Sequence, residues 1–550
     1  MLLPWNPSSL QVFMVALLVF LLVYHSAVYY QRRLMLSNIP PGPQPLPVVG
    51  NFGALLVPSF ILRRVRKIPD RATTPTQGLA ELARLYGDVF SLFVGSQLMV
   101  VLNGFDVIKD AFSNQPDVFS DRPDIPVVSI MTKRKGIVFA PYGPVWRKHR
   151  KFCHATLRNF GFGKLSLEPC ILQGVTTVKQ ELLRLNRESD GAGVDLAALI
   201  GNAVSNVICS LTLGQRFHHD DSEFRTLLDL MVRGLEICVN SPAVLINICP
   251  LLYHLPCGVF KELRQVERDI TLFLKKMIAT HRDTLDPQQP RDLVDMYLME
   301  MQSQKAAGEQ DDSFTEDYLF YIIGDLIIAG TDTTTNSVLW VLLYMVLHPD
   351  VQDQVQAEID KVVGKERPLS LTDRGSLPYT EATIMEVQRL AVAVPLGIPH
   401  MASKKTELRG YVIPQGTVVL PNLWSVHRDP TVWEEPDSFN PTRFLDAEGK
   451  LIRKESFIPF GIGNAEFKCG VLGCDTEAPL FFRTQGLHGR TAGQDGAVFD
   501  GHQPTAEFQA QTPRRFDSAS SARALRADAG AVPLRRLRPP TLLNTRGPSG

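Results

Sequence analysis

The sequence has no net charge and lacks the usual features of secreted or nucleic-acid-binding proteins. Its 550 residues carry 57 Lys and Arg against 57 Asp and Glu, which argues against a charge-driven nucleic-acid binder. Eight cysteines occur without CxxC pairs, so neither a disulfide scaffold nor a zinc ribbon is indicated. No glycosylation sequon is present once those interrupted by proline are set aside. We therefore expect a body with reduced thiols on the cytosolic side of any membrane.

The composition is that of a large globular protein. Hydrophobic residues make up 45% of the chain and charged residues 21%, which excludes wholesale disorder and collagen-like fibres. Helical patterns occur at residues 78–86 and 106–113 and dominate from 146 to 364, whereas strand patterns occur at 89–102 and 412–420. The prediction is a mainly α fold with a small β-sheet subdomain.

An apolar run at residues 10–30 predicts a transmembrane signal anchor. At about 1.5 Å per residue it is long enough to cross a hydrocarbon core roughly 30 Å thick. Arg32 and Arg33 follow it and no charge precedes it, so we expect residues 1–9 in the lumen and the body in the cytoplasm. A cleaved signal peptide is the alternative, disfavoured because no basic segment precedes the run and no Ala-x-Ala site follows it. Residues 31–47 read as a basic stop and a proline-rich hinge, although prolines also occur in plain linkers.

A second long apolar segment, residues 313–347, predicts one helix that opens with a capping box at 313–316. Asp325 and Asp332 lie inside it, and each would cost roughly 2.5 to 3.5 kcal/mol at a bilayer centre. We therefore expect a helix buried in the protein core rather than a second span. The two acids share a helix face with Ala329 and Thr333, and this polar face is where we expect chemistry.

Four separated motifs follow one another along the chain. They are 146–150 (Trp-Arg-Lys-His-Arg), 329–334 (Ala-Gly-Thr-Asp-Thr-Thr), 386–389 (Glu-Val-Gln-Arg) and 439–444 (Phe-Asn-Pro-Thr-Arg-Phe). With these motifs, residues 36–463 resemble the microsomal cytochrome P450 monooxygenases, which are haem-thiolate enzymes. Within that family the chain is similar to family 2 and its 2U branch of long-chain fatty-acid hydroxylases. The resemblance implies a P450 catalytic domain over residues 48–463.

The resemblance also implies roles for individual residues. Asp332 and Thr333 would deliver protons to oxygen bound at the haem, as the catalytic pair. The residues expected to contact haem b are Trp146, Arg150, Ala329, Gly330 and His400. A buried structural triad is expected from Glu386, Arg389 and Arg443.

The implied reaction is hydroxylation of a lipophilic substrate, by resemblance a fatty acid near its ω end. O2 would be the oxidant, and electrons would come from NADPH through an NADPH-cytochrome reductase, with cytochrome b5 as a further partner. The expected place is the endoplasmic reticulum membrane, with a single span and a cytoplasmic body, while a mitochondrial membrane stays open. No nucleic-acid partner is expected.

The sequence departs from the family where the iron ligand is needed. The family's cysteine thiolate lies in the pattern Phe-x-x-Gly-x-Arg-x-Cys-x-Gly. Residues 460–463 begin that pattern, but Phe467 stands in the cysteine position, and Cys469, the one candidate metal ligand, comes two residues late. The alternative to an active enzyme is therefore a haem-less, catalytically inactive membrane-anchored isoform.

The remaining segment, residues 464–550, follows no pattern of the family. It is rich in Gly, Ala, Pro and Arg, a composition that predicts a disordered tail. A frame-shifted exon is a second hypothesis, because codons chosen for residues 485–500 and read one nucleotide later can spell a cysteine-ligand loop and the helix after it. A genomic sequence without such codons would contradict it.

Overall fold

The protein is described here by a computed structural model. It describes residues 38–45, 50–51, 74–95, 97–188, 194–218, 221–240, 242–247, 249–308, 313–365 and 367–463, together with short stretches between 11 and 27. The expectations for Phe467, Cys469 and the tail at 464–550 lie outside the described residues.

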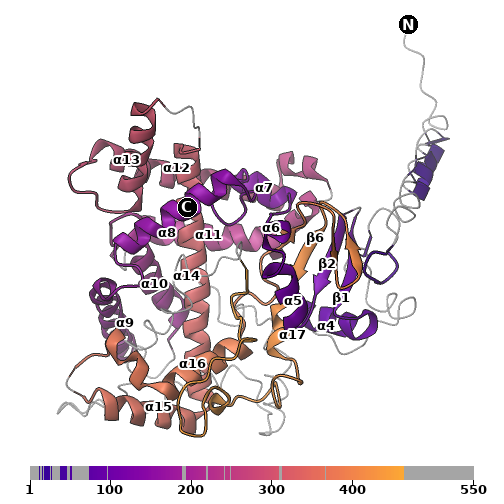
Figure 1. The fold of residues 1–550 in the computed structure, drawn as a ribbon. Helices are drawn as coiled ribbons and strands as arrows, with labels where there is room; N and C mark the ends of the chain where they lie inside the picture. The colour runs from indigo at the N-terminus through magenta and orange to yellow at the C-terminus, as the bar shows by residue number, and fades with distance from the viewer. Residues whose placement is uncertain are drawn as a thin grey trace, which may run out of the picture.

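The described body is mainly helical with small sheets, as predicted (Figure 1). Its helices are α4 (Pro75–Tyr86), α5 (Phe105–Phe112), α6 (Pro116–Phe119), α7 (Pro126–Thr132), α8 (Pro144–Asn159), α9 (Glu168–Glu188), α10 (Leu196–Thr212), α11 (Ser222–Asn240), α12 (Gly258–Asp283), α13 (Leu293–Ala306), α14 (Glu316–Leu347), α15 (Pro349–Val362), α16 (Pro378–Leu390) and α17 (Leu423–His427). Short 3-10 helices are η1 (Leu165–Leu167), η2 (Pro242–Asn247), η3 (Pro250–His254), η4 (Leu371–Ser376) and η5 (Pro441–Phe444).

The strands form one four-stranded and one two-stranded sheet. They are β1 (Val89–Val94), β2 (Gln97–Leu102), β3 (His400–Met401), β4 (Thr406–Leu408), β5 (Tyr411–Ile413) and β6 (Val418–Pro421). The larger sheet has the order β1-β2-β6-β3, in which β2 and β6 are parallel and the other neighbours antiparallel. β1 and β2 fall within the strand pair predicted at 89–102, because their β-branched and aromatic residues suit a pleated, half-buried surface.

Two predicted helix starts are wrong. α4 begins at Pro75 rather than at 78, because the Thr74 side chain accepts a hydrogen bond from the Gln77 amide and so caps the helix earlier. α14 begins at Glu316, with Thr315 and not Ser313 as its cap. The Thr315 hydroxyl accepts from the Tyr318 amide at 3.3 Å, and Glu316 and Asp317 then occupy the first turn, where the helix dipole favours acids.

α14 runs through the middle of the helical part of the body (Figure 1). Its apolar side chains lie in the main core with those of α10, and its carboxyl-terminal half packs with α15 and α16. Within the described residues it is the one helix long and apolar enough to cross a membrane by length and composition. Leu319, Ile322 and Leu326 are fully buried by the surrounding helices, so this helix serves the protein core, as its two acids predicted.

Hydrogen bonds attach the proline-rich segment to the larger sheet. The Ser91 amide of β1 donates to the Pro41 carbonyl at 2.8 Å, and the Ser91 hydroxyl donates to the Pro40 carbonyl at 2.8 Å. Gly42 lies so close that a Cβ there would meet the Ser91 carbonyl oxygen at 2.0 Å. These contacts fix the direction in which residues 40–42 run along β1.

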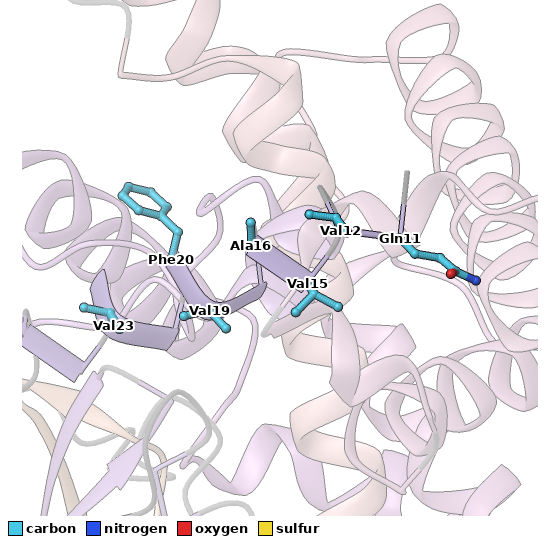
Figure 2. A pocket seen from close by; sticks show the side chains of 7 residues that line it. All are labelled: Gln11, Val12, Val15, Ala16, Val19, Phe20 and Val23. Carbon is cyan, nitrogen blue, oxygen red and sulfur yellow. The ribbon is translucent and has the colours of Figure 1, made fainter. Parts of the chain in front are cut away.

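The described residues between 11 and 27 are helical and exposed. Figure 2 shows the side chains along one open apolar surface of this segment, which are Gln11, Val12, Val15, Ala16, Val19, Phe20 and Val23. Val12 is 69% exposed and Phe20 is 64% exposed. Such a surface is costly in water, and the described part of the body does not cover it.

A buried ion-pair cluster joins α16 to η5. Arg389 donates from Nε and Nη2 to both oxygens of Glu386, at 2.7 and 2.8 Å, and both residues have no exposed surface. Arg443 Nε reaches the same carboxylate at 3.2 Å. The Arg389 guanidinium also donates to the His427 and Pro436 carbonyls, so one arginine holds three segments together.

We predict that Glu386→Ala lowers the free energy of unfolding by about 3 to 5 kcal/mol, because it leaves two guanidinium groups without their carboxylate in the interior. Urea unfolding followed by circular dichroism measures this. Lys276→Ala is the matched control: Lys276 pairs with Glu223 at 3.0 Å, but both side chains are about two-thirds exposed. The control is expected to shift stability by less than about 0.5 kcal/mol. Equal effects from the two variants would contradict a structural role for the buried cluster.

Candidate active site

The centre of the site is the turn of α14 from Ala329 to Thr333. The Thr333 hydroxyl donates to the Ala329 carbonyl at 2.7 Å, and the Ser337 hydroxyl donates to the Thr333 carbonyl at 2.8 Å. Hydroxyls bound in this way compete with the backbone ladder and bend a helix locally. Ala329 and Thr333 are both half-buried.

Asp332 lies in the same turn and has an unusual environment for an acid. It is half-buried. Burial raises its pKa, and a hydrogen bond with Asn336 opposes that shift. A carboxyl whose pKa is raised takes up and releases a proton more readily near pH 7.

The polar run from 329 to 334 divides between two faces of α14. The Ser205 hydroxyl of α10 donates to Thr331 Oγ1 at 3.1 Å, and the methyl group of Thr335 lies 3.8 Å from where a Cβ on Gly201 would stand. Thr331 and Thr335 are therefore used in helix packing. Asp332 and Thr333, the predicted catalytic pair, lie in the same turn of α14 as Ala329.

Asp325 fastens the α7–α8 connection to α14. Its carboxylate accepts hydrogen bonds from the Ile137 amide at 2.7 Å and the Val138 amide at 2.9 Å. Gly136 permits this approach: its φ is +87°, and a Cβ there would lie 2.3 Å from Asp325 Oδ2. Burial raises the pKa of Asp325 to about 6, and the two amide hydrogen bonds offset part of that shift.

Trp146 and Arg150 come together on α8 as their spacing predicted. The Arg150 guanidinium lies 5.0 Å from the centre of the Trp146 ring. The indole N–H donates to the Ile137 carbonyl at 2.8 Å, so in this structure it fastens the same connection as Asp325. Burial lowers the pKa of Arg150, but the group stays cationic at neutral pH.

His400 begins β3 and is buried against Phe112, with ring centres 4.4 Å apart. Its Nδ1 lies 2.7 Å from the Phe119 carbonyl, which assigns the proton to Nδ1 when the ring is neutral. Burial first, and then the positive charge of Arg122, hold its pKa well below the usual value. His400 is therefore a neutral ring at pH 7.

Arg122 is a residue of the site that the sequence analysis missed. It is 3% exposed, and it donates from Nε to the Val138 carbonyl at 3.0 Å and from Nη1 to the Pro399 carbonyl at 3.2 Å. A buried cation between the α7–α8 connection and β3 is suited to an anionic group. In the sequence this arginine stands between Asp121 and Pro123, outside the four motifs.

Most of the chain is similar in sequence to known proteins. The family model for Cytochrome P450 matches residues 40–465. The chain belongs to the cytochrome P450 family. It is 56% identical to human Cytochrome P450 2U1 over 440 residues, which cover 78% of this chain and 80% of the relative. Mouse Cytochrome P450 2U1 is also 56% identical, over 82% and 84% of the two chains. Human Cytochrome P450 2D6 is 40% identical over 79% and 84%.

By family, the chain is thus a P450 monooxygenase of family 2, and the family implies a haem cofactor. On the distal side the chemistry of the residues fits such a group, because Thr333 and Asp332 can hold and move a proton and the cations Arg122 and Arg150 suit an anionic propionate. On the proximal side they do not fit. The described body ends at Gly463, and the sequence places Phe467, which has no ligand atom, where the thiolate is required.

The cysteines within the described residues do not replace that ligand. All six of them are free; four belong to α8, α9, α10 and α11, and Cys249 and Cys257 directly precede η3 and α12. Burial raises the pKa values of Cys153 and Cys209 beyond the range in which a thiolate forms. No described cysteine lies in the segment from 439 to 463 that approaches the family's ligand loop.

We predict a pH-dependent stability from Asp325. Folded Asp325, with a pKa of about 6, binds its proton more tightly than the unfolded chain, where the value is 3.8. Its contribution is therefore fully present below about pH 3.8 and is lost as pH rises through about 6, with a slope of up to about 1.4 kcal/mol per pH unit. Urea unfolding at several pH values between 4 and 7 measures the slope.

Asp325→Asn keeps an oxygen acceptor for the two amides but cannot ionise, so its slope is expected to be shallower than that of the parent. Asp353→Asn, on the exposed face of α15, is the control and is expected to keep the parent slope. If Asp325→Asn also keeps it, another group titrates.

Proposed function

We propose that this chain is built as a membrane-anchored monooxygenase that hydroxylates a long-chain fatty acid near its ω end. The observation that carries the proposal is the turn of α14 in which the Thr333 hydroxyl donates to the Ala329 carbonyl at 2.7 Å next to the Asp332 carboxyl. The similarity to Cytochrome P450 2U1 proteins over most of the body supports the substrate class. O2 is the oxidant, and NADPH supplies electrons through a reductase, with cytochrome b5 as a second donor.

The residues of this turn of α14 bind and position the reactants, and they do not themselves break bonds. In the family the haem supplies the activation of oxygen. The Thr333 hydroxyl donates to the Ala329 carbonyl, and it can donate instead to a ligand bound beside this turn. Asp332, whose pKa burial raises, can pass protons between solvent and that hydroxyl. Trp146, Arg150, Gly330 and His400 are proposed as the surroundings of the haem, together with Arg122.

The amino-terminal segment supports a membrane location. An exposed apolar helix such as that in Figure 2 is stable in lipid, and the hydrogen bonds of Pro40 and Pro41 to Ser91 would hold the body at a set orientation to it. We propose an anchor at residues 10–30, a hinge up to 47 and a body on the cytoplasmic face of the endoplasmic reticulum. A mitochondrial membrane would use the same anchor.

A second candidate is a haem-less, catalytically inactive isoform. The observation that favours it is Phe467 in the position of the ligand cysteine, just beyond residue 465, where the match to the family ends. An aromatic side chain has no lone pair to offer iron, and Cys469 stands two residues too late. The two candidates share the body and differ in the proximal ligand.

A carbon monoxide difference spectrum of the reduced 550-residue protein distinguishes the two candidates, because the Soret band reports thiolate ligation. From Phe467 we expect no thiolate-type band. If such a band appears, Cys469→Ser is the matched test: loss of the band identifies Cys469 as the ligand and supports the active monooxygenase. Product analysis with an ω-labelled fatty acid, NADPH and reductase then tests the substrate class.

A further inference from the structure

His281 lies at the carboxyl end of α12 and is buried where three parts of the body meet. Its Nδ1 lies 2.8 Å from the Met277 carbonyl of α12. Its Nε2 lies 3.1 Å from the Leu213 carbonyl, at the end of α10, and 3.0 Å from Asp292 Oδ2, at the start of α13. The side chains of His281 and Asp292 are 2% and 1% exposed. One ring therefore joins α12 to α10 and α13 away from solvent.

Both ring nitrogens of His281 face oxygen atoms that accept hydrogen bonds. A neutral imidazole has a single N–H, so its second nitrogen turns a lone pair towards its partner. Here that lone pair would oppose either the Met277 carbonyl or the oxygens of Leu213 and Asp292. A proton on Asp292 in place of the ring would still leave the Leu213 carbonyl opposite a bare nitrogen. The imidazolium, with two N–H groups, gives every one of these oxygens a donor.

His427 shows the opposite case in the same protein. Its Nδ1 also lies close to the carbonyl four residues earlier, that of Leu423, at 2.9 Å. Its Nε2, however, accepts from the Ile458 amide at 3.1 Å, which requires a nitrogen without a proton. Burial, together with the charges of Arg389 and Arg428, lowers the pKa of His427 to about 3. His427 is therefore a neutral ring and an internal comparison for His281.

The charged groups that face the His281 ring come from the start of α13, whereas α10 and α12 supply backbone carbonyls. Asp292 Oδ1 accepts from the Asp295 amide at 2.9 Å, and Arg291 donates to both oxygens of Asp295 at 2.7 and 2.8 Å. The nitrogen and oxygen atoms of His281, Asp292 and Asp295 lie within 4.8 Å of one another. Each of these side chains already has a hydrogen-bond partner, so the group is an ion-pair network and not a metal site.

We propose that His281 is a buried imidazolium that locks the end of α12 to α10 and α13, and that loss of its proton opens this junction. Gly214, with φ of +59°, permits the close approach, because a Cβ there would lie 2.6 Å from Asp292 Oδ2. The junction also adjoins the helix of the active site. Arg282, the residue after His281, pairs with Glu316 at the start of α14 at 2.7 Å.

The direction of the pH dependence follows from these partners. Burial by itself would lower the pKa of His281, but the hydrogen bond and charge of Asp292 and the two carbonyls outweigh burial, so the pKa is raised above 6.5. The contribution of the lock to stability is therefore complete below about pH 6.5 and is lost as pH rises through the folded pKa. Asp325, with a pKa of about 6, is mostly ionised at pH 7, so a comparison of pH 7 with pH 9 separates the two groups.

The test follows the ring proton and does not need a haem site. In the full-length protein in lipid nanodiscs, hydrogen exchange at the C2 carbon of histidine, read by mass spectrometry between pH 5 and pH 9, gives the pKa of each ring. His281 is expected to titrate above 6.5, and His427 is expected to show no titration in this range. A His281 midpoint at or below 6.5 would overturn the proposal, whether or not any variant folds.

Amide hydrogen exchange at residues 209–214 and 292–295, corrected for the intrinsic effect of pH, then measures opening of the junction. In the parent, protection is expected to fall about three- to tenfold from pH 7 to pH 9. His281→Gln keeps an N–H donor but cannot titrate, so its protection is expected to be the same at both pH values. His254→Gln replaces an exposed histidine of η3; it is the matched control and is expected to keep the parent's change. No change in the parent, or a parent-like change in His281→Gln, would show that His281 does not control the junction.

Discussion

The burial of α14 is the constraint on which the rest of the structure depends. A 32-residue helix that is largely apolar must be covered by other elements, and α10, α12, α15 and α16 each pack against it. The polar side chains of α14 that apolar contacts cannot satisfy then need hydrogen-bond or ion-pair partners. The site is the part of α14 where this cover is incomplete, around Ala329, Asp332 and Thr333, and where polar groups could remain without destabilising the core.

Two buried carboxylates show two solutions to that requirement. Glu386 accepts hydrogen bonds from the guanidinium groups of Arg389 and Arg443 and so joins α16 to η5. Asp325 accepts hydrogen bonds from two backbone amides instead; burial raises its pKa to about 6, and the amides offset part of that shift. The attachment of the α7–α8 connection to α14 is therefore sensitive to protonation of Asp325.

The two sides of the expected haem site are unequally complete. The distal side has Asp332, Thr333 with its hydroxyl bonded to the Ala329 carbonyl, and the buried Arg122, which the sequence analysis did not identify. The proximal side has the buried triad and the start of the ligand pattern at 460–463, but Phe467 follows in place of a thiolate. Among the described residues, contacts within the body hold the triad, the larger sheet and α14 in place.

The sequence alone determined what local pattern can decide. Helical periodicity, the strand pair at 89–102, the acids that keep α14 out of a bilayer, and the departure at Phe467 were all readable, because each depends on residues close together in the chain. Helix starts at Thr74 and Thr315 were missed, since several nearby residues could have served as the cap. Arg122 and the Asp325 contacts with Ile137 and Val138 join segments nearly 200 to 280 residues apart, and no local signal encodes such a pairing. Tertiary structure alone decided them, because a buried polar group takes whichever partner the packing of distant elements brings within hydrogen-bonding distance.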